Sequence, residues 1–330
     1  MVRKQKDHPF KEVRKRVRNR LFPSTVYANH YRRVDFLAEL KTIALQKRYH
    51  LPLVHAIYAE DQLNLLLKKR SWLNAALVGS FHLPEDSGFM KRLTGGKYSD
   101  KYKHLDAAIV MSRSMIPFTE TIVGKGKVFW VPHGIRTDTF TPAAGSLTEG
   151  NQLKRKIRVL TVGNHGRDWD TYKKVVLEVK KQQLPVDFTA VVPAGVQKKL
   201  SGLPGVELLS GISEENLITL YRSADLMFMP VKFSSANNSV LEAMACGVPA
   251  LSSRVGGISD YVDDSCGWLV PGGDVCETVT LLKELEQHRN RLTAMKKAAR
   301  NRSLDFDWNR IASQVEDVYA FALERWERSV

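Results

Sequence analysis

The sequence predicts an α/β fold built from two parallel-sheet domains. Apolar runs of strand length alternate with segments of helical periodicity along most of the chain, and this alternation is typical of parallel sheets covered by helices. The 330 residues are enough for two domains with separate cores. Between the two halves, residues 141–152 are small, polar and glycine-containing, which is typical of an interdomain linker.

In the first half, we expect a basic amphipathic helix at residues 9–21 and a second helix at 31–48. Strands are expected at 51–58, 74–81, 105–111 and 128–131, with helices at 62–69 and 116–123. The first helix has two interpretations. Its apolar stripe could lie on anionic lipid, or it could pack on the first domain while its arginines face solvent. The stripe consists of Phe10, Val13, Val17 and Leu21.

The second half is expected to alternate in the same way. Its strands are predicted at 157–163, 186–192, 206–209 and 226–231, with helices at 171–182 and 214–223. From Asp274 onward the chain is helical, and Asp274 and Glu277 have the spacing of a capping box. Asp307 is expected to cap the last helix, whose apolar stripe contains Ile311, Val315, Val318 and Ala322.

The most informative segment is 225–274, which reads as strand, polar loop, short helix, strand, double-glycine turn and strand. Asn237 and Asn238 stand where the short helix should begin, and Gly247 and Pro249 end it in the expected order. Strands that lead into loops and helix N-termini at their carboxyl ends form phosphate sites in open parallel sheets. The segment therefore predicts a nucleotide or phosphate site.

Positive charge is concentrated in the first half. Residues 1–150 hold 26 Lys and Arg against 13 Asp and Glu, a net charge of +13, whereas residues 151–330 hold 24 against 22, a net charge of +2. A basic first half suggests an anionic ligand or an anionic membrane surface, although basic soluble proteins without such partners are common. No recognised nucleic-acid motif accompanies the charge, so nucleic acid is not expected as a partner.

Composition favours a cytoplasmic protein. No apolar run approaches the ~18 residues that span a bilayer, and the N-terminus lacks the apolar stretch of a secretory signal. Three cysteines cannot all pair, and no C-x-x-C spacing provides a metal or redox site. The chain is expected in the cytoplasm, with association at the cytoplasmic face of a membrane as the further hypothesis.

Residues 225–274 resemble the donor-binding core of the family 4 retaining glycosyltransferases (glycosyl transferases group 1), which have the GT-B architecture. The resemblance rests on LEAMACGVPAL (241–251), Gly256-Gly257 and GWLVPGGD (267–274), with weaker matches at LTVG (160–163), VPHGIRTDTFTP (131–142), SFHLP (80–84) and DWNRIASQVEDVY (307–319). It implies two Rossmann-like parallel-sheet domains facing a cleft. Residues 1–150 would form the acceptor side, 151–305 would bind a nucleotide sugar, and 306–330 would form a helix packing back on the first domain.

The implied function is sugar transfer from a nucleotide-sugar donor, with retention of configuration and with no metal or cofactor. The acceptor class stays open between a glycan, a lipid-linked sugar and a small molecule. Family members begin with a buried strand and a glycine-rich turn, whereas this chain begins with a basic helix. Either the first domain is reduced, or the chain is incomplete at its N-terminus. The alternative function is a non-catalytic nucleotide-sugar-binding or scaffolding protein of the same fold.

The loop at 162–174 follows the first strand of the second domain, where family members place an arginine and a lysine on the donor diphosphate. Asn164 occupies the usual arginine place here. Arg167, flanked by glycines such as Gly163, is the predicted phosphate ligand, with Lys173 as a second candidate. Arg167 could instead form a surface ion pair with a neighbouring aspartate.

The loop at 232–242 supplies the other predicted donor contacts. Family members carry two glutamates eight residues apart, of which the second matches Glu242 and would accept hydrogen bonds from the ribose hydroxyls. Ser234 replaces the first, which in the family contacts the transferred sugar. The remaining predicted phosphate contacts are Lys232, Asn237, Asn238 and Ser239. The alternative for Glu242 is a solvent-facing helix residue.

His82 ends a strand of the first domain and matches a family histidine that reaches across the cleft toward the sugar or phosphate. We predict a catalytic role for it, with a packed or solvated histidine as the alternative. Gly256 and Gly257 would let the backbone approach the donor closely.

Overall fold

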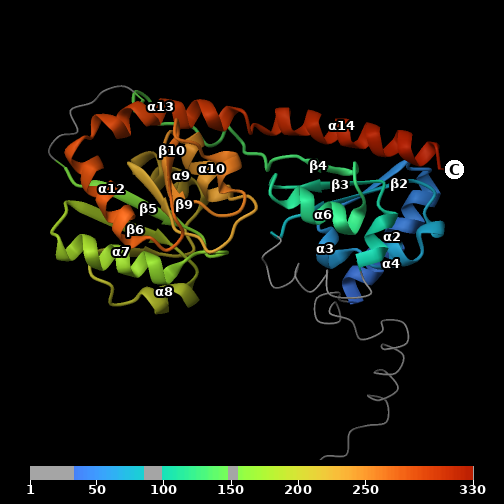
Figure 1. Cartoon of the computed structure of the whole chain (residues 1–330), viewed down its shortest axis with the longest axis horizontal. Helices are drawn as coiled ribbons and strands as arrows, with labels where there is room; N and C mark the ends of the chain where they lie inside the picture. The colour runs from blue at the N-terminus through green and yellow to red at the C-terminus, as the bar shows by residue number, and fades with distance from the viewer. Residues whose placement is uncertain (1–32, 85–98, 148–154, 330) are drawn as a thin grey trace, which may run out of the picture.

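Two parallel sheets, each covered by helices, form the core of the protein (Figure 1). The computed structural model describes residues 33–84, 99–147 and 155–329. The sheets are built from residues 53–130 and 157–270, so they lie on either side of the predicted linker. The predicted architecture of two parallel-sheet domains is confirmed. The helix predicted at 9–21 lies outside the described residues, as does part of the linker.

The first sheet has the order β1-β2-β3-β4, and its neighbouring strands pair in parallel. The strands are β1 (Leu53–Ala56), β2 (Ala76–Phe81), β3 (Ala107–Val110) and β4 (Val128–Trp130). The helices are α2 (Arg33–Tyr49), α3 (Ala59–Gln62), α4 (Leu65–Lys68) and α6 (Met115–Val123), with 3-10 turns η2 (Arg70–Trp72) and η3 (Ser99–His104). Every residue of β2 and β3 is buried, as expected for central parallel strands covered on both faces.

The second sheet has the order β10-β9-β8-β5-β6-β7. Its strands are β5 (Ile157–Val162), β6 (Val186–Val191), β7 (Val206–Leu209), β8 (Leu226–Met229), β9 (Ala250–Ser253) and β10 (Gly267–Val270). Its helices are α7 (Trp169–Lys181), α8 (Ala194–Leu200), α9 (Glu214–Ser223), α10 (Asn238–Ala245), α11 (Ile258–Tyr261), α12 (Val275–Gln287) and α13 (Asn290–Leu304). The strand order reverses at β5 and β8, and such a switch point is where doubly wound sheets bind ligands.

The prediction of one continuous helix at 62–69 is wrong. The chain forms two short helices, α3 and α4, because a carboxylate from α2 caps the second one. Glu39 accepts hydrogen bonds from the backbone N–H groups of Asn64, Leu65 and Leu66 at 2.9–3.0 Å. These N–H groups cannot also continue a helix from α3. The short helices α8 and α11 were not predicted.

The last helix, α14 (Trp308–Glu327), leaves the second domain and lies along the first sheet (Figure 1). Its apolar stripe packs in one buried cluster with side chains of β2 and β3, including Val78 and Ile109. A polar contact adds to this packing, because the ring nitrogens of His55 bond to the hydroxyls of Tyr319 (2.8 Å) and Ser80 (2.7 Å). The C-terminal helix therefore joins the two domains.

Truncating this stripe should destabilise the protein. Ile311 is 1% exposed in the cluster that α14 shares with β2 and β3, so Ile311→Ala should lower the free energy of unfolding by about 2–5 kcal/mol through lost burial and a residual cavity. Leu177→Ala, on the half-exposed surface of α7, is the control and should have a much smaller effect. Urea unfolding of both variants measures the difference, and equal losses would show that α14 is not anchored by this stripe.

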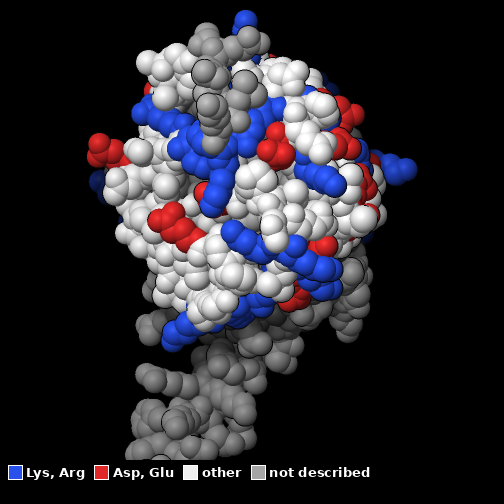
Figure 2. Space-filling model, turned by 90° about the vertical axis from the view of Figure 1, so that its left-hand side faces the viewer, with Lys and Arg blue, Asp and Glu red and all other residues white. Residues whose placement is uncertain are grey.

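Charge on the second domain is mixed. Figure 2 views the end of the molecule formed by this domain, and there clusters of Lys and Arg side chains lie beside separate Asp and Glu side chains. This agrees with the small net charge of residues 151–330. Among the described residues, no helix is long and apolar enough to cross a bilayer.

Candidate functional site

Loops at the carboxyl ends of the two sheets face each other and touch. The Ser235 hydroxyl of the second domain donates a hydrogen bond to the backbone carbonyl of His82, immediately after β2. A second contact joins α11 to the end of β3, where the Tyr261 hydroxyl donates to the Met111 carbonyl at 2.6 Å. Beside it, the Arg113 N–H donates to a carboxylate oxygen of Asp260 at 2.8 Å. The two domains therefore face each other in the structure, as predicted.

The double glycine makes this approach of the domains possible. A Cβ on Gly257 would lie 2.6 Å from the Ser112 Cβ of the first domain. Gly256 has a φ of +52°, and a side chain there would overlap the Ser234 carbonyl. That carbonyl accepts a hydrogen bond from the Gly257 N–H at 2.8 Å. These glycines place the loop after β9 directly against the loop after β8.

Arg167 is held by backbone carbonyls at the end of β5. Its guanidinium donates to the Val162 carbonyl at 2.6 and 3.2 Å and to the His165 carbonyl at 2.8 Å. The same group lies 3.5 Å from the Ser239 hydroxyl on α10. Gly163, with a φ of +86°, makes room for it, since a Cβ there would lie 2.9 Å from a guanidinium nitrogen. The structure thus brings together three of the predicted donor residues.

No carboxylate among the described residues pairs with Arg167. Its hydrogen bonds all go to carbonyls and a hydroxyl, and burial lowers the pKa of its guanidinium to about 10. The neighbouring Asp168 and Asp170 lie near Lys232 instead, at 3.9 and 3.5 Å. A largely buried cation without a carboxylate partner is costly unless an anion binds there.

The other predicted residues of these loops take different positions. Lys232 is exposed, and its backbone N–H donates to the Gly166 carbonyl at 2.8 Å, which joins the loops at 162–174 and 232–242. Asn164 is exposed and accepts a hydrogen bond from the Trp169 indole N–H at 3.2 Å. Lys173 lies half-buried on α7, and in the described part of the chain no hydrogen bond or ion pair joins it to the other predicted residues.

The start of α10 points its free N–H groups at the same region. Asn237 is the N-cap, and its side chain accepts a hydrogen bond from the Val240 N–H at 3.4 Å. Asn238 and Ser239 form the first turn, where backbone N–H groups have no acceptor within the helix. Ser234, which replaces the family glutamate, is buried and offers no carboxylate to a sugar. The helix start and Arg167 together make a positive site.

Glu242 is mostly buried and not a solvent-facing helix residue. One of its carboxylate oxygens accepts a hydrogen bond from the Tyr221 hydroxyl at 2.7 Å, and the Tyr221 side chain is fully buried. Burial raises the pKa of the Glu242 carboxyl above its usual range, and the Tyr221 hydrogen bond opposes that shift. The second carboxylate oxygen stays available as an acceptor.

His82 lies in the contact between the domains, beside the Tyr58 ring at 4.5 Å. Its Nδ1 is buried without a hydrogen-bond partner among the described residues and is 3.8 Å from a Glu60 carboxylate oxygen. Burial, with help from the nearby His133 and His55, lowers the pKa of the imidazole to about 4. His82 is therefore neutral at pH 7, so it can exchange hydrogen bonds with a ligand but cannot act as a permanent cation.

Sequence reasoning missed the residues that position this site. Tyr221 reads as an ordinary core aromatic on α9, and no local pattern links it to Glu242. Glu60 fixes the end of β2, because its carboxylate accepts hydrogen bonds from the N–H groups of His82 and Leu83 at 2.7 and 3.2 Å. In the described part of the chain, no group of three or more His, Cys, Asp or Glu side chains is arranged to hold a metal ion.

Residues 156–288 match the family model described as glycosyl transferases group 1. The second domain is a glycosyl transferases group 1 domain. The predicted resemblance is thus confirmed over the part of the chain that holds Arg167, α10 and the double glycine.

Relatives extend the similarity of this group 1 domain to longer segments. The chain is 27% identical over 300 residues to a D-inositol 3-phosphate glycosyltransferase of Xylanimonas cellulosilytica, which covers 84% of this chain and 68% of the relative. It is 26% identical over 206 residues to a sulfoquinovosyl transferase of Arabidopsis thaliana, which covers 59% of this chain. That second match spans only 40% of the relative's length.

Solved structures confirm the fold. The structure of the Anabaena protein HepE in complex with UDP-glucose aligns with a TM-score of 0.69 at 15% identity, covering 96% of this chain and 90% of HepE. Sucrose-phosphate synthase from Thermosynechococcus elongatus aligns with the same TM-score at 20% identity, covering 86% of this chain and 76% of that enzyme. The predicted GT-B arrangement is therefore confirmed.

Proposed function

We propose that the protein transfers a sugar from a nucleotide-sugar donor to an acceptor, with retention of configuration and without a metal ion. The observation that carries the proposal is Arg167, a largely buried guanidinium that has no carboxylate partner among the described residues. It lies beside the N-terminus of α10 at the switch point of the sheet. A diphosphate would fill this position, because its oxygens accept from both arginine and helix N–H groups.

This arrangement suits the departure of a nucleoside diphosphate. Negative charge accumulates on the diphosphate as the bond to the sugar breaks, and preorganised donors around it lower the barrier. Arg167 is oriented by its hydrogen bond to the Val162 carbonyl, and a donor that the protein itself orients needs little reorganisation. The exposed Lys232 lies close enough to the loop to add a second positive charge.

Glu242 would hold the ribose. The Tyr221 hydroxyl occupies one side of the carboxylate and leaves acceptor capacity for the ribose hydroxyls. On the facing domain, His82 would contact the transferred sugar or its phosphate as a neutral hydrogen-bonding group. The HepE structure with UDP-glucose shows that a protein of this fold binds such a donor.

Ser234 favours the second candidate function, a donor-binding protein without turnover. The family glutamate that contacts the transferred sugar is absent at this position, and the buried serine hydroxyl makes only a 3.4 Å contact with the Ala236 carbonyl. Both functions require the same diphosphate site. They differ in whether the sugar is transferred and not in whether the donor binds. The acceptor class, the cytoplasmic setting and the membrane contact remain predictions from the sequence.

A donor screen followed by a transfer assay should separate these functions. Thermal unfolding with UDP-, GDP- and ADP-sugars should show a raised midpoint for at least one donor, because a ligand that binds only the folded state stabilises it. Hydrolysis or transfer of that donor should continue in EDTA, and NMR of the product should show the anomeric configuration of the donor. Stabilisation without any turnover would support the binding protein, and no stabilisation by any donor would contradict both functions.

A further inference from the structure

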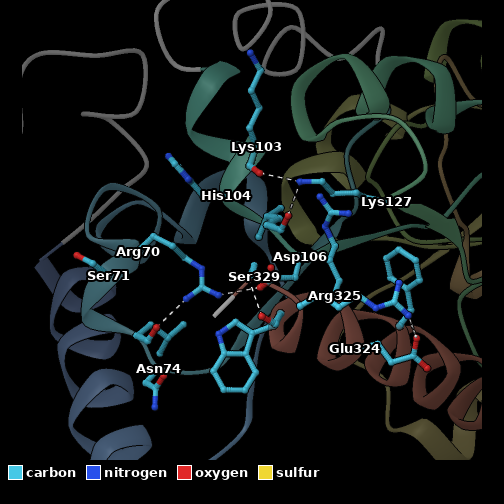
Figure 3. Close-up of a pocket in the computed structure, with 15 residues that line it drawn as sticks. Arg70, Ser71, Asn74, Lys103, His104, Asp106, Lys127, Glu324, Arg325 and Ser329 are labelled. Carbon is cyan, nitrogen blue, oxygen red and sulfur yellow. Dashed lines mark hydrogen bonds and ion pairs between the residues drawn. The ribbon is translucent and has the colours of Figure 1, made fainter.

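A cavity lies in the first domain, away from the proposed donor site. Its volume is about 760 Å³. The residues that line it precede β2, β3 and β4 or belong to the end of α14 (Figure 3). It therefore lies at the amino ends of the strands, whereas the interdomain contact lies at their carboxyl ends. The donor residues contribute nothing to its lining.

The lining of this cavity is basic. It contains five Lys and Arg side chains and two carboxylates, an excess of three positive charges. The basic residues are Arg70, Lys103, Lys127, Arg325 and Arg328, and the acidic residues are Asp106 and Glu324. Such an excess within a concave site attracts anions more strongly than the same charges on a flat surface.

Several of these charges have structural roles. Arg70 donates to the Leu73 carbonyl at 2.8 Å and to the Asp106 carboxylate at 2.9 Å, so it forms the wall of the cavity. Lys127 donates to the carbonyls of Lys103 and Leu105 at 2.9 and 3.0 Å. Because an ammonium has three N–H groups, these two bonds orient Lys127 and leave one N–H available.

Arg325 differs from Arg70 and Arg328, which pair with Asp106 and Glu324, because no carboxylate among the described residues pairs with it. It is exposed on the last turn of α14, and Figure 3 shows it on the same side of the cavity as Lys127. Burial lowers the pKa of the Lys127 ammonium, and the charge of Arg325 lowers it further, against the opposing effect of Asp106. Lys127 and Arg325 thus repel each other, while the Asp106 carboxylate, which is bonded to Arg70, attracts Lys127.

We propose that this cavity binds a small phosphorylated molecule, with its phosphate between Lys127 and Arg325. Phosphate oxygens accept strong hydrogen bonds from both ammonium and guanidinium groups, and a bound dianion would remove the repulsion between the two cations. The cavity has the size of ordinary small-molecule sites, about 300–1,000 Å³. The inference does not depend on the donor function, because the two sites share no residue.

Titration calorimetry with pyrophosphate as the probe tests this site. Arg325→Ala should weaken binding by about tenfold or more, since it removes a charged hydrogen-bond partner, while Arg325→Lys should retain most of the affinity. Arg310→Ala is the matched control, because Arg310 is an exposed arginine on the same helix that pairs with Asp305. Pyrophosphate affinity that is the same in Arg325→Ala and the natural protein would overturn the proposal.

Pyrophosphate also resembles the diphosphate of a nucleotide, so the donor site needs its own control. Lys232→Ala should leave the Arg325-dependent binding of pyrophosphate unchanged, and Arg325→Ala should leave the Lys232-dependent binding of the nucleoside diphosphate unchanged. Loss of all pyrophosphate binding in Lys232→Ala would assign that binding to the donor loop and overturn the cavity site. The proposed donor function would survive that result.

Discussion

Arg167→Ala should weaken the binding of a nucleoside diphosphate by about 1.5–3 kcal/mol, which is the cost of losing a charged hydrogen-bond partner. The Val162 carbonyl orients the guanidinium. The affinity is therefore lost because the guanidinium no longer contacts the ligand. Lys232→Ala should also weaken this binding, but by a smaller amount, because Lys232 is exposed. Calorimetry with the diphosphate identified in the donor screen measures both variants.

The nucleoside without phosphates serves as the control ligand. Its affinity should change little in either variant, since Arg167 and Lys232 are assigned to the phosphates alone. If both variants lost affinity for the nucleoside and the diphosphate equally, neither residue would contact the phosphates. Urea unfolding of Arg167→Ala would then show whether the lost bonds to Val162 and His165 had altered the fold.

Glu242→Ala should weaken nucleotide-sugar binding by about 1–3 kcal/mol through the loss of the carboxylate that accepts from the ribose. Glu242→Gln removes the negative charge but keeps the side-chain shape and an acceptor oxygen beside Tyr221. It therefore shows how much of the affinity depends on the charge. Affinity for a 2′,3′-dideoxyribose analogue should be weak in the natural protein and should change little in Glu242→Ala. Unchanged affinity for the full donor in Glu242→Ala would contradict the ribose assignment.

Donor affinity should also depend on pH through this residue. Burial raises the pKa of Glu242 above its usual value, so on acidification it becomes protonated at a higher pH than an exposed glutamate with a pKa of about 4.3. Protonation removes the negative charge and turns one acceptor oxygen into a donor, so donor affinity should fall as the pH falls through that raised pKa. Glu242→Gln should flatten the profile. A profile that is the same in this variant would place the titrating group elsewhere.

Local patterns predicted most of the fold. The caps are an example, because Asp274, Asp307 and Asn237 each accept a hydrogen bond from the first turn of the helix that they begin. These caps depend on residues within one turn of each other, so the local sequence is enough to predict them. The break between α3 and α4 could not be read in this way, because it depends on Glu39, 25 residues before Asn64.

In the candidate site, too, the sequence predicted the features that depend on nearby residues and missed those that depend on distant ones. Arg167 and Glu242 could be chosen from their loops, and the structure places Arg167 beside Ser239 and Glu242 beside Tyr221. The neutral state of His82 depends on burial between two domains, which no local pattern encodes. The basic cavity is assembled from the ends of three strands and the last helix, so its residues are up to 259 positions apart, from Arg70 to Ser329.

The central claim is that a diphosphate lies between Arg167 and the N-terminus of α10. The most direct test is a crystal structure of the protein with the nucleoside diphosphate of its best donor. The account predicts phosphate oxygens within hydrogen-bond distance of the Arg167 guanidinium and the Ser239 backbone N–H, with the ribose hydroxyls at Glu242. A diphosphate bound at full occupancy away from Arg167 would contradict it.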